Sequence, residues 1–342
     1  MDRPRLIVPD SMSRRRALGL GAAAAAALTL PGCSRGRSDE PAPAEPATLA
    51  TGNKGGVYNR FGSGLASLVS QVTGVQLTPV VTDGSIANLR KVASGQNDVG
   101  FTTSDSAYAA YEGLGQFASG PLRFHALGRT YDNYVHVVVP MASKIDSLEK
   151  VAGKVVSVGP ENSGTKLVAD MILAQAGLAT SVTKRTLSLE QAVKQLKDKA
   201  EGKDGIDVMI WSGGLPTGPI EDLQKTIGFR LVNIGAVAQT IALKQFGGYI
   251  VSSIPPKTYG LASAVPTLTI PNYLITRPNL PDSWAWWIVN TLFRRQKDLI
   301  GDPNDKASFH PEAGALDPRS AIATMPVPLH PAAERWYRAN HI

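Results

Sequence analysis

The segment at residues 50–66, ATGNKGGVYNRFGSGLA, constrains the fold of this chain more than any other. Residues 48–51 suit a short strand, and three glycines then fall within residues 52–56. A strand, a glycine turn and a helix in this order leave backbone N–H groups at the start of the helix, where they suit an anion. An ordinary βα connection explains the turn equally well, so the rest of the chain has to decide. The predicted helix is marked by apolar residues at helical spacing: Val57, Phe61, Leu65, Leu68, Val69 and Val72.

The same succession of strand, turn and helix occurs twice more before residue 113. Strands are expected at 75–81 and 98–102, turns at 82–85 (TDGS) and 103–105 (TSD), and helices at 86–94 and 106–112. Three such units predict a parallel sheet whose strand carboxyl ends lie along one edge. In open α/β sheets, ligands bind outside those carboxyl ends.

A second α/β set follows the buried-strand run at 134–140, which suits a crossover. Strands are expected at 154–159, 207–211 and 229–234, the last of the set, with turns at 160–165 and 212–217 and helices at 166–176 and 190–200. Residues 267–276 suit a strand that crosses back. The helix after Pro281 carries Trp284, Trp287, Ile288 and Leu292 on one face, which indicates core packing.

The organisation therefore predicts an α/β fold of two lobes with the ligand in the cleft between them. We expect lobe one at 48–137, lobe two at 138–264, and a crossover back to lobe one with C-terminal helices at 265–342.

The first 33 residues read as a lipoprotein signal peptide. Arg14, Arg15 and Arg16 precede an uncharged run over 17–30, which is too short to span a bilayer comfortably. The sequence LPGC at 30–33 resembles a lipobox, which makes Cys33 the expected lipidation site. The paired arginines also resemble a twin-arginine signal, so Sec and twin-arginine export both stay open. The Pro- and Ala-rich residues 34–47 suit a tether to the membrane.

Several function classes find no support in the sequence. The formal charge of +7 comes with no Lys/Arg run after Cys33 that would indicate a nucleic-acid partner. Residues 159–166 approach a phosphate-binding P-loop, but Thr165 precedes Lys166, the reverse of the order that nucleotide binding needs. The five histidines are scattered, and no hydrolase elbow or metal-ligand spacing occurs. We therefore expect no enzyme, no metal and no cofactor.

Some charged and histidine residues near the turns need a separate interpretation. Asp83 and Asp105 precede helices, where capping is their ordinary role, although a place in the cleft stays open for both. Lys54 and Lys166 are close enough in sequence to supply a cation, but a solvated surface position explains them too. His136 lies in an apolar strand and is expected to be a hydrogen-bonded core histidine.

Eight short motifs occur in a fixed order between about residues 48 and 338. They are Gly55-Gly56-Val57-Tyr58 with Phe61-Gly62, Thr82-Asp83-Gly84-Ser85 with Asn88-Leu89, Ser94-Gly95 with Asp98, Ser104-Asp105 with Ala109, Ser157-Val158-Gly159 with Ser163-Gly164-Thr165, Asp207 with Trp211, Gly214-Leu215-Pro216-Thr217, and Pro328-Leu329-His330-Pro331 with Trp336-Tyr337. In this order the motifs resemble the TAXI family, the solute receptors of tripartite ATP-independent periplasmic (TRAP) transporters.

The resemblance implies a type II periplasmic-binding-protein fold that closes on a small anionic solute, such as glutamate or 2-oxoglutarate. It also implies delivery of that solute to TRAP membrane permease subunits, by a receptor anchored outside the cell membrane. A sensor lipoprotein that signals to a membrane kinase without transport is the alternative. The expected binding residues are Gly55, Gly56, Tyr58, Ser85, Thr103 and Ser104 of lobe one, and Ser163, Gly164, Thr165 and Trp211 of lobe two.

Overall fold

The computed structural model describes residues 40–244, 248–302, 304–305 and 310–342. Residues 40–342 form one compact unit. The predicted signal peptide and the lipidation site Cys33 lie outside the described residues. Within the described part of the chain, no helix combines the length and the apolar character that a membrane span requires.

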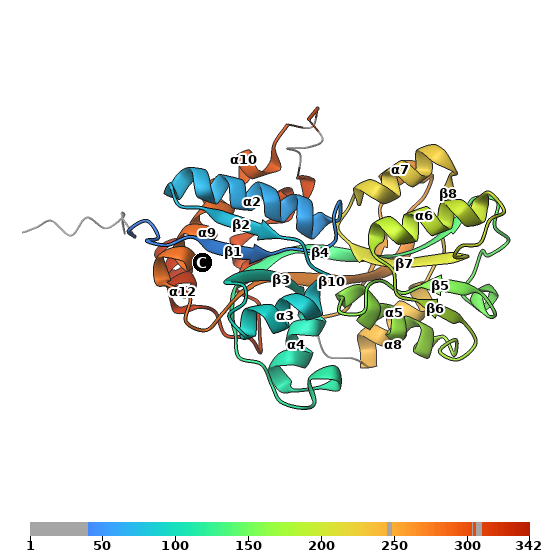
Figure 1. Cartoon of the computed structure of the whole chain (residues 1–342), viewed down its shortest axis with the longest axis horizontal. Coiled ribbons are helices and arrows are strands. Elements are labelled where there is room, and N and C mark those ends of the chain that lie inside the picture. The colour runs from blue at the N-terminus through green and yellow to red at the C-terminus, as the bar shows by residue number, and fades with distance from the viewer. Residues whose placement is uncertain (1–39, 245–247, 303, 306–309) are drawn as a thin grey trace, which may run out of the picture. The chain divides into compact units, whose positions relative to one another are not determined.

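The body is built on a ten-stranded mixed sheet with the order β2-β1-β3-β10-β4-β7-β5-β6, to which β8 is added beside β4 and β9 beside β10 (Figure 1). The strands are β1 (Ala47–Ala50), β2 (Leu77–Val80), β3 (Val99–Thr103), β4 (His125–Pro140), β5 (Val155–Ser157), β6 (Thr183–Arg185), β7 (Val208–Gly213), β8 (Phe229–Leu231), β9 (Ile250–Ile254) and β10 (Val265–Thr276).

Two long strands join the two halves of this sheet. β4 and β10 run antiparallel to each other, with register shifts between Pro271 and Tyr273 and between Leu274 and Ile275. On one side, β10 pairs with β3, which is parallel to β1, and β1 is parallel to β2. On the other side, β4 pairs with β7, which is parallel to β5, and β5 is parallel to β6. We call the part around β1–β3 the first half and the part around β5–β7 the second half.

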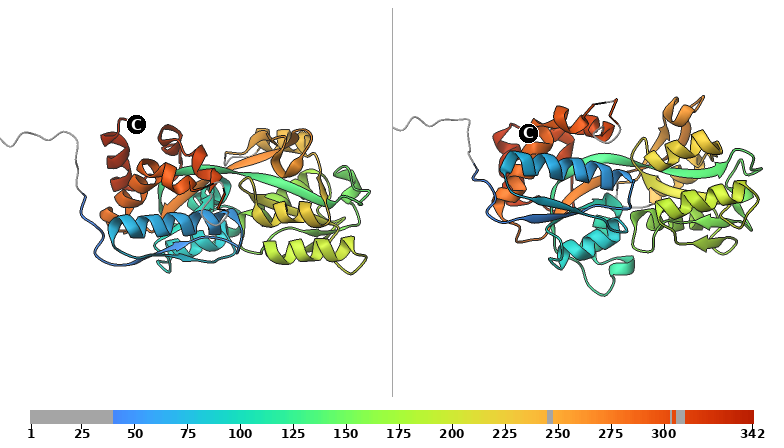
Figure 2. Two further views of the ribbon diagram at one scale, coloured as in Figure 1. Left: turned by 90° about the horizontal axis from the view of Figure 1, so that it is seen from above. Right: turned by 45° about the horizontal axis from the view of Figure 1, so that its top comes forward.

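The helices lie on both faces of the sheet in each half (Figures 1 and 2). They are α2 (Val57–Thr73), α3 (Ser85–Ala93), α4 (Ser104–Glu112), α5 (Gly164–Gln175), α6 (Leu189–Ala200), α7 (Gly218–Thr226), α8 (Gly235–Lys244), α9 (Asp282–Arg294), α10 (Gln296–Ile300), α11 (Pro318–Ala321) and α12 (Pro331–Ala339). Short 3₁₀ turns, among them η3 (Thr258–Gly260) and η4 (Pro311–Ala315), connect them.

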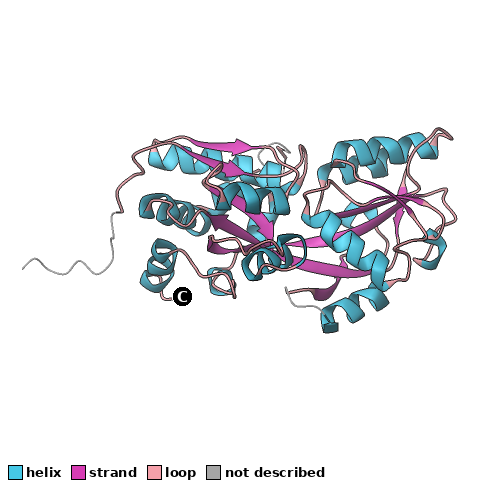
Figure 3. Ribbon diagram, turned by 60° about the horizontal axis from the view of Figure 1, so that its bottom comes forward, coloured by secondary structure: helices cyan, strands magenta, loops and turns pink. Residues whose placement is uncertain are grey.

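The helix α2 follows from the apolar spacing seen in the sequence. Phe61, Leu65 and Val69 are fully buried on its inner face. The helix ends at Gly74, whose left-handed backbone (φ 73°) lets its N–H reach the Ser70 carbonyl. Its core extends to α9 and α12, so the C-terminal part of the chain packs on the first half (Figure 3).

The predicted core face of α9 is confirmed for Trp284, Ile288 and Leu292, all of which are buried. Trp287 lies at the edge instead, where its indole N–H donates to the carbonyls of Glu40 and Pro41. The Trp284 indole donates to the Glu45 carbonyl. Residues 40–46, which were expected within a tether, are therefore held against α9 in this structure.

The structure corrects several expected boundaries. Two helices begin two residues earlier than their apolar spacing predicts. The helix α4 begins at Ser104 and α5 begins at Gly164. The strand β4 begins at His125 rather than at residue 134. Its first part carries the ion pair of Arg129 and Asp132, which hides the strand from a hydrophobicity pattern. The strand at 229–231 is not the last of its set, since β9 follows at Ile250–Ile254.

Candidate functional site

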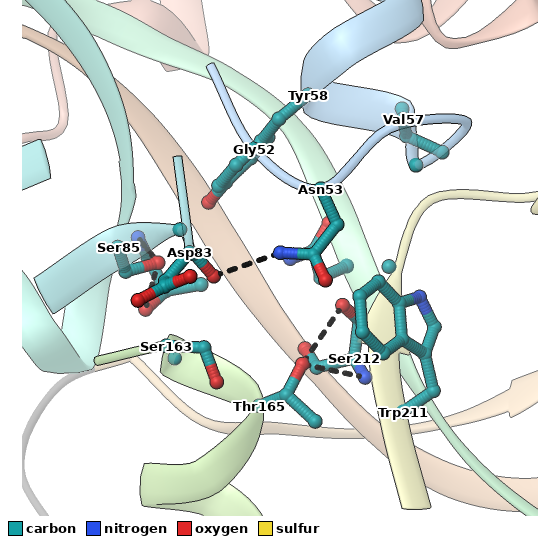
Figure 4. A pocket seen from close by; sticks show the side chains of 16 residues that line it. Gly52, Asn53, Val57, Tyr58, Asp83, Ser85, Ser163, Thr165, Trp211 and Ser212 are labelled. Carbon is teal, nitrogen blue, oxygen red and sulfur yellow. Dashed lines mark hydrogen bonds between the residues drawn. The ribbon is translucent and has the colours of Figure 1, made fainter. Parts of the chain in front are cut away.

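A small pocket lies where the two halves of the sheet meet, with a cavity volume of about 40 Å³ (Figure 4). It is formed by the starts of α2, α3 and α5, the ends of β3 and β7, and one residue of β4. The sixteen lining residues are Gly52, Asn53, Gly56, Val57, Tyr58, Asp83, Gly84, Ser85, Thr103, Asn133, Ser163, Gly164, Thr165, Trp211, Ser212 and Gly213.

Tyr58 supplies an aromatic wall from the first turn of α2. Its ring stacks on Phe101 with centroids 5.2 Å apart, and its hydroxyl donates to Asn272 Oδ1. Burial raises the pKa of Tyr58, so the phenol is neutral at physiological pH. Because the hydroxyl proton is donated to Asn272, the hydroxyl cannot also donate to a solute in this arrangement.

The start of α3 brings a second helix terminus to the pocket. Gly84 is its N-cap, and the φ of 121° at this position favours glycine. Ser85 is almost fully buried, and its hydroxyl oxygen accepts a bond from the Thr103 backbone N–H at 3.1 Å. Ser85 and Thr103, from two predicted turns, are therefore in direct contact beside the pocket.

The second half contributes the start of α5. The Ser163 hydroxyl donates to the Pro160 carbonyl and accepts from the Lys166 N–H, as an N-cap does. The Thr165 hydroxyl oxygen accepts from the Ser212 N–H at 3.2 Å. Since both hydroxyls are engaged, the first-turn N–H groups of α5 are the donors that this helix directs to the pocket.

Trp211 and Ser212 at the end of β7 close the pocket on the same side. A Cβ on Gly56 would lie 3.7 Å from the Trp211 benzo carbon Cζ2, so the indole ring forms an apolar wall across from α2. The indole Nε1 and the Ser212 hydroxyl are buried, and neither finds a hydrogen-bond partner among the described residues. Nε1 lies beside Gly213, away from the cavity, whereas Ser212 lines the pocket.

Three helix starts at one small cavity make its electrostatics favourable for an anion. Unpaired N–H groups and the positive ends of the helix dipoles both act at the starts of α2, α3 and α5. Hydrogen bonds from such donors to a charged acceptor are stronger than neutral ones. The arrangement can therefore hold a carboxylate without a cationic side chain.

The charged residues considered in the sequence take different places. Lys166 does not line the pocket: its amine pairs with Asp170 at 2.8 Å. Asp105 is buried behind the pocket, where it accepts from the Ser106 N–H and the Tyr249 hydroxyl, each at 2.6 Å, and burial raises the pKa of its carboxyl. Asp83 lines the pocket and does not cap α3. The expectation of a capping role is wrong for both acids.

His136 is confirmed as a hydrogen-bonded core histidine. It is fully buried, and its Nε2 lies 3.0 Å from the Tyr259 hydroxyl. Burial lowers the pKa of His136 to about 4, so the ring is neutral at physiological pH.

Eight of the ten residues expected to bind a solute line this one pocket: Gly56, Tyr58, Ser85, Thr103, Ser163, Gly164, Thr165 and Trp211. Gly55 and Ser104 do not line it. Gly55 has φ 75° and lies against Pro219, and Ser104 is the first residue of α4, at the side facing Gly248. Whether any of the ten contacts a solute stays a prediction.

Several lining residues were not among the predicted site residues: Gly52, Asn53, Val57, Asp83, Gly84, Asn133, Ser212 and Gly213. Most are immediate neighbours of predicted residues in the same turns, so extending each turn by two residues would have found them. Asn133 is different, because it lies within β4 and no turn signal marks it.

Asn53 connects the two sides of the pocket. Its amide nitrogen donates to the carbonyls of Thr82 and Asp83, at 3.3 and 3.1 Å, and its Oδ1 accepts from the Leu189 N–H at 3.0 Å. Leu189 is the first residue of α6 in the second half. One side chain therefore joins two turns of the first half to a helix start of the second.

Among the residues that the structure describes, no group of three or more His, Cys, Asp or Glu side chains could hold a metal ion.

Comparison with known proteins places the chain in a family. Residues 49–340 match the NMT1-like family. A solved structure from Bordetella bronchiseptica RB50 shares 16% identity over 86% of this chain and 89% of its own, with a TM-score of 0.52. The periplasmic binding protein BugD shares 11% identity over 87% of this chain and 98% of its own, also with a TM-score of 0.52.

A third structure, the alkanesulfonate-binding protein SsuA from Xanthomonas axonopodis pv. citri bound to MOPS, is 16% identical over 87% of this chain and 85% of its own, with a TM-score of 0.42. At these identities the likeness concerns the fold. The fold of this chain is the α/β fold of periplasmic binding proteins, as expected from the sequence.

Proposed function

The chain belongs to the NMT1-like family, and from this membership and the geometry of its pocket we propose that it is an extracytoplasmic solute receptor that binds a small carboxylate and passes it to a membrane permease. The observation that carries the proposal is the meeting of three helix starts, those of α2, α3 and α5, at a pocket that also includes the aromatic walls Tyr58 and Trp211. Donors of this kind suit a carboxylate.

Binding is coupled to the approach of the two halves in this proposal. The helix starts of α2 and α3 belong to the first half, and that of α5 to the second, so a solute carboxylate is fully surrounded only when the halves are close. Closure removes water from the bound group and strengthens its hydrogen bonds. We assign the moving bodies to residues 48–137 and 138–264, with 265–342 returning to the first.

The partner in the membrane is proposed from the order of the TAXI-like motifs, which favours TRAP permease subunits. Cys33 is the proposed attachment site for a lipid that keeps the receptor near the permease. Uptake of a labelled solute by cells with and without the receptor separates transport from signalling to a kinase, because only a transport receptor changes uptake.

Thermal unfolding and calorimetry with a panel of solutes test the carboxylate assignment. A ligand present at about 100 times its Kd stabilises the folded state by about 2.7 kcal/mol, which raises Tm by several degrees. We expect such a rise with small carboxylates and none with neutral sugars at the same concentration. A rise with a neutral solute only would contradict the proposal.

A further inference from the structure

We propose that Asn133 donates a side-chain N–H to an oxygen of the solute, and that the buried Asn272 holds the Asn133 amide in the orientation that this contact needs. The inference rests on the proposed function, because it adds a binding residue and a positioning residue to the same pocket. It also restricts the solute group that reaches Asn133 to a hydrogen-bond acceptor.

The place of Asn133 in the fold is the first observation. Asn133 lies on β4, one of the two strands that join the halves of the sheet, and it lines the pocket. The residue is only 4% exposed. A buried amide nitrogen that lacks a partner is costly, so the large majority of such groups in folded proteins are hydrogen-bonded.

The hydrogen bonds of Asn133 are the second observation. Its Oδ1 accepts from Asn272 Nδ2 at 3.0 Å. Its Nδ2 carries two N–H donors, and neither forms a hydrogen bond with a residue that the structure describes. The side chain is close enough to the Tyr58 hydroxyl to oppose, as a donor, the rise that burial causes in the Tyr58 pKa. Only one N–H can turn toward Tyr58, so the other is left for a solute.

Asn272 decides which end of the Asn133 amide faces the pocket. Asn272 is fully buried, its Oδ1 accepts from the Tyr58 hydroxyl at 2.5 Å, and its Nδ2 donates to the Tyr131 carbonyl at 2.9 Å. A carbonyl oxygen can only accept, so the atom of Asn272 beside Tyr131 has to be the nitrogen. The same nitrogen faces Asn133, so the atom of Asn133 beside it has to be the oxygen. The Asn133 nitrogen is therefore directed away from Asn272.

The donor on Asn133 differs from the donors at the helix starts. Those of α2 and α3 belong to the first half and those of α5 to the second, whereas β4 pairs with β10 and β7 and so belongs to both. Pairing of the central strands holds Asn133 in place. A fixed donor favours an acceptor oxygen and disfavours a donor at the same position, because two facing donors leave both groups unpaired.

Thermal unfolding of the full chain without solute tests the orientation of the amides. Asn133→Asp keeps an oxygen opposite Asn272 Nδ2, whereas Asn133→Leu, which is similar in size, cannot accept a hydrogen bond. We expect Asn133→Leu to lower Tm at least about twice as much as Asn133→Asp does. An equal or larger fall for Asn133→Asp would overturn the assigned orientation.

Calorimetry tests the contact with the solute. The probes are acetate, succinate and L-glutamate, each compared with the analogue in which every carboxylate is a primary amide. Asn133→Asp turns an oxygen to the pocket in place of the N–H group, so we expect its affinity for the carboxylate that the wild type binds most tightly to fall by about 100-fold or more. The amide analogue should lose no affinity, because its own N–H can donate to the new oxygen. Asn272→Asp, which puts an acceptor beside Asn133 and turns that amide, should also weaken the carboxylate more than the amide analogue.

The control is Asn59→Asp, which makes the same change of charge in the first turn of α2. Asn59 does not line the pocket, and its Oδ1, which accepts from the Gly55 N–H at 3.4 Å, is kept in the variant. We expect its affinity for the same carboxylate to stay within about threefold of the wild type. A loss as large as that of Asn133→Asp would refute the inference, because added charge alone would then explain it.

The remaining outcomes separate this inference from the proposed function. If a carboxylate binds and Asn133→Asp holds it as tightly as the wild type does, the contact is refuted while the proposed receptor stands. An equal loss of affinity for the carboxylate and its amide analogue would refute it too, because a structural defect weakens both. If none of the three carboxylates binds the wild type, the proposed function and the contact fail together, and the unfolding comparison still decides the orientation of the amides.

Discussion

At the scale of single residues, Tyr58 contributes both to the stability of the fold and to the wall of the pocket. The ring stacks on Phe101, lies 6.5 Å from the ring of Tyr131, and forms a pocket wall. The hydroxyl donates to Asn272, whose amide in turn donates to the Tyr131 carbonyl and to Asn133 Oδ1. The hydroxyl thus belongs to a polar network that includes the pocket-lining Asn133.

Two substitutions of Tyr58 separate these roles. Tyr58→Phe removes one hydrogen bond and should lower the unfolding free energy by about 1 kcal/mol, with solute affinity within about threefold of the wild type. Tyr58→Ala removes the ring, and we expect a loss of about 3 kcal/mol and a more than tenfold loss of affinity. Denaturant unfolding and calorimetry measure both. A tenfold loss of affinity in Tyr58→Phe would mean that the hydroxyl binds the solute directly.

Glu312 is a buried acid close behind the pocket wall. It is 5% exposed, and neither carboxylate oxygen has a hydrogen-bond partner among the described residues. Its nearest cation is Arg60, at 3.5 Å, and a Cβ on Gly214 would lie 3.1 Å from its Cγ. Burial raises the pKa of Glu312 to about 7, from an ordinary value of 4.5, although Arg60 opposes the shift.

This raised pKa predicts a loss of stability with rising pH. Between pH 4.5 and 7 the folded chain holds a proton on Glu312 that the unfolded chain has released, so unfolding becomes easier by about 3 kcal/mol across that interval. Glu312→Gln, which stays neutral, should lack this loss. The neighbouring His310, whose pKa burial lowers to about 4, changes stability in the opposite direction. The difference between wild type and variant therefore isolates Glu312, and equal pH profiles would refute the prediction.

At the scale of elements, the contact between Asn53 and the start of α6 is the clearest link between the two halves. We expect Asn53→Ala to lower the unfolding free energy by about 1–2 kcal/mol, since it removes three hydrogen bonds of Asn53. It should also separate the halves, which small-angle scattering reports as a larger radius of gyration.

The matched control is Ser188→Ala, which removes the N-cap of the same helix and costs about 1 kcal/mol. It leaves Asn53 in place, so the radius of gyration should stay that of the wild type. A radius that grows equally in both variants would show that the effect comes from a weakened α6 and not from Asn53.

Elements also show what the sequence could and could not predict. The βα units at β1, β3 and β5 follow from local spacing and glycine turns, and so eight of the ten expected site residues meet at one pocket. The central strands β4 and β10 are harder, because their pairing depends on partners more than 130 residues apart, such as Thr269 with Tyr134. Asn133 joins the pocket through the pairing of β4 with β10 and with β7, where its neighbour Tyr134 is paired with Gly213. Asp83 was visible in its turn, but its direction toward the cavity depends on how α3 packs.

At the scale of the whole described body, the two halves already touch across the pocket. The Ala87 N–H donates to the Asn162 carbonyl, and the Arg90 guanidinium donates to Asn162 Oδ1. The Tyr249 hydroxyl donates to Asp105. These contacts join helices α3 and α4 of the first half to the segments around α5 and β9, so the approach of the halves is set by a few short polar bonds and by the small residues between them.

Gly164 is the small residue on which this approach depends most directly. A Cβ at Gly164 would lie 2.8 Å from Ser85 Oγ and 2.9 Å from Thr103 Oγ1, both in the opposite half. Ser85 cannot turn away without losing its bond to the Thr103 N–H. We therefore expect Gly164→Ala to hold the halves apart and to weaken solute binding by about tenfold or more, because the binding-competent arrangement becomes rare.

Folding should be nearly unaffected, since alanine suits the first turn of α5 better than glycine does. Gly314→Ala is the control, because nothing lies within 4 Å of a Cβ at that position. Calorimetry should show weaker binding for Gly164→Ala only, with a larger radius of gyration in scattering. Equal affinity in the two variants would contradict this prediction. It would mean that solute binding does not require the close approach of Gly164 to Ser85 seen in this structure.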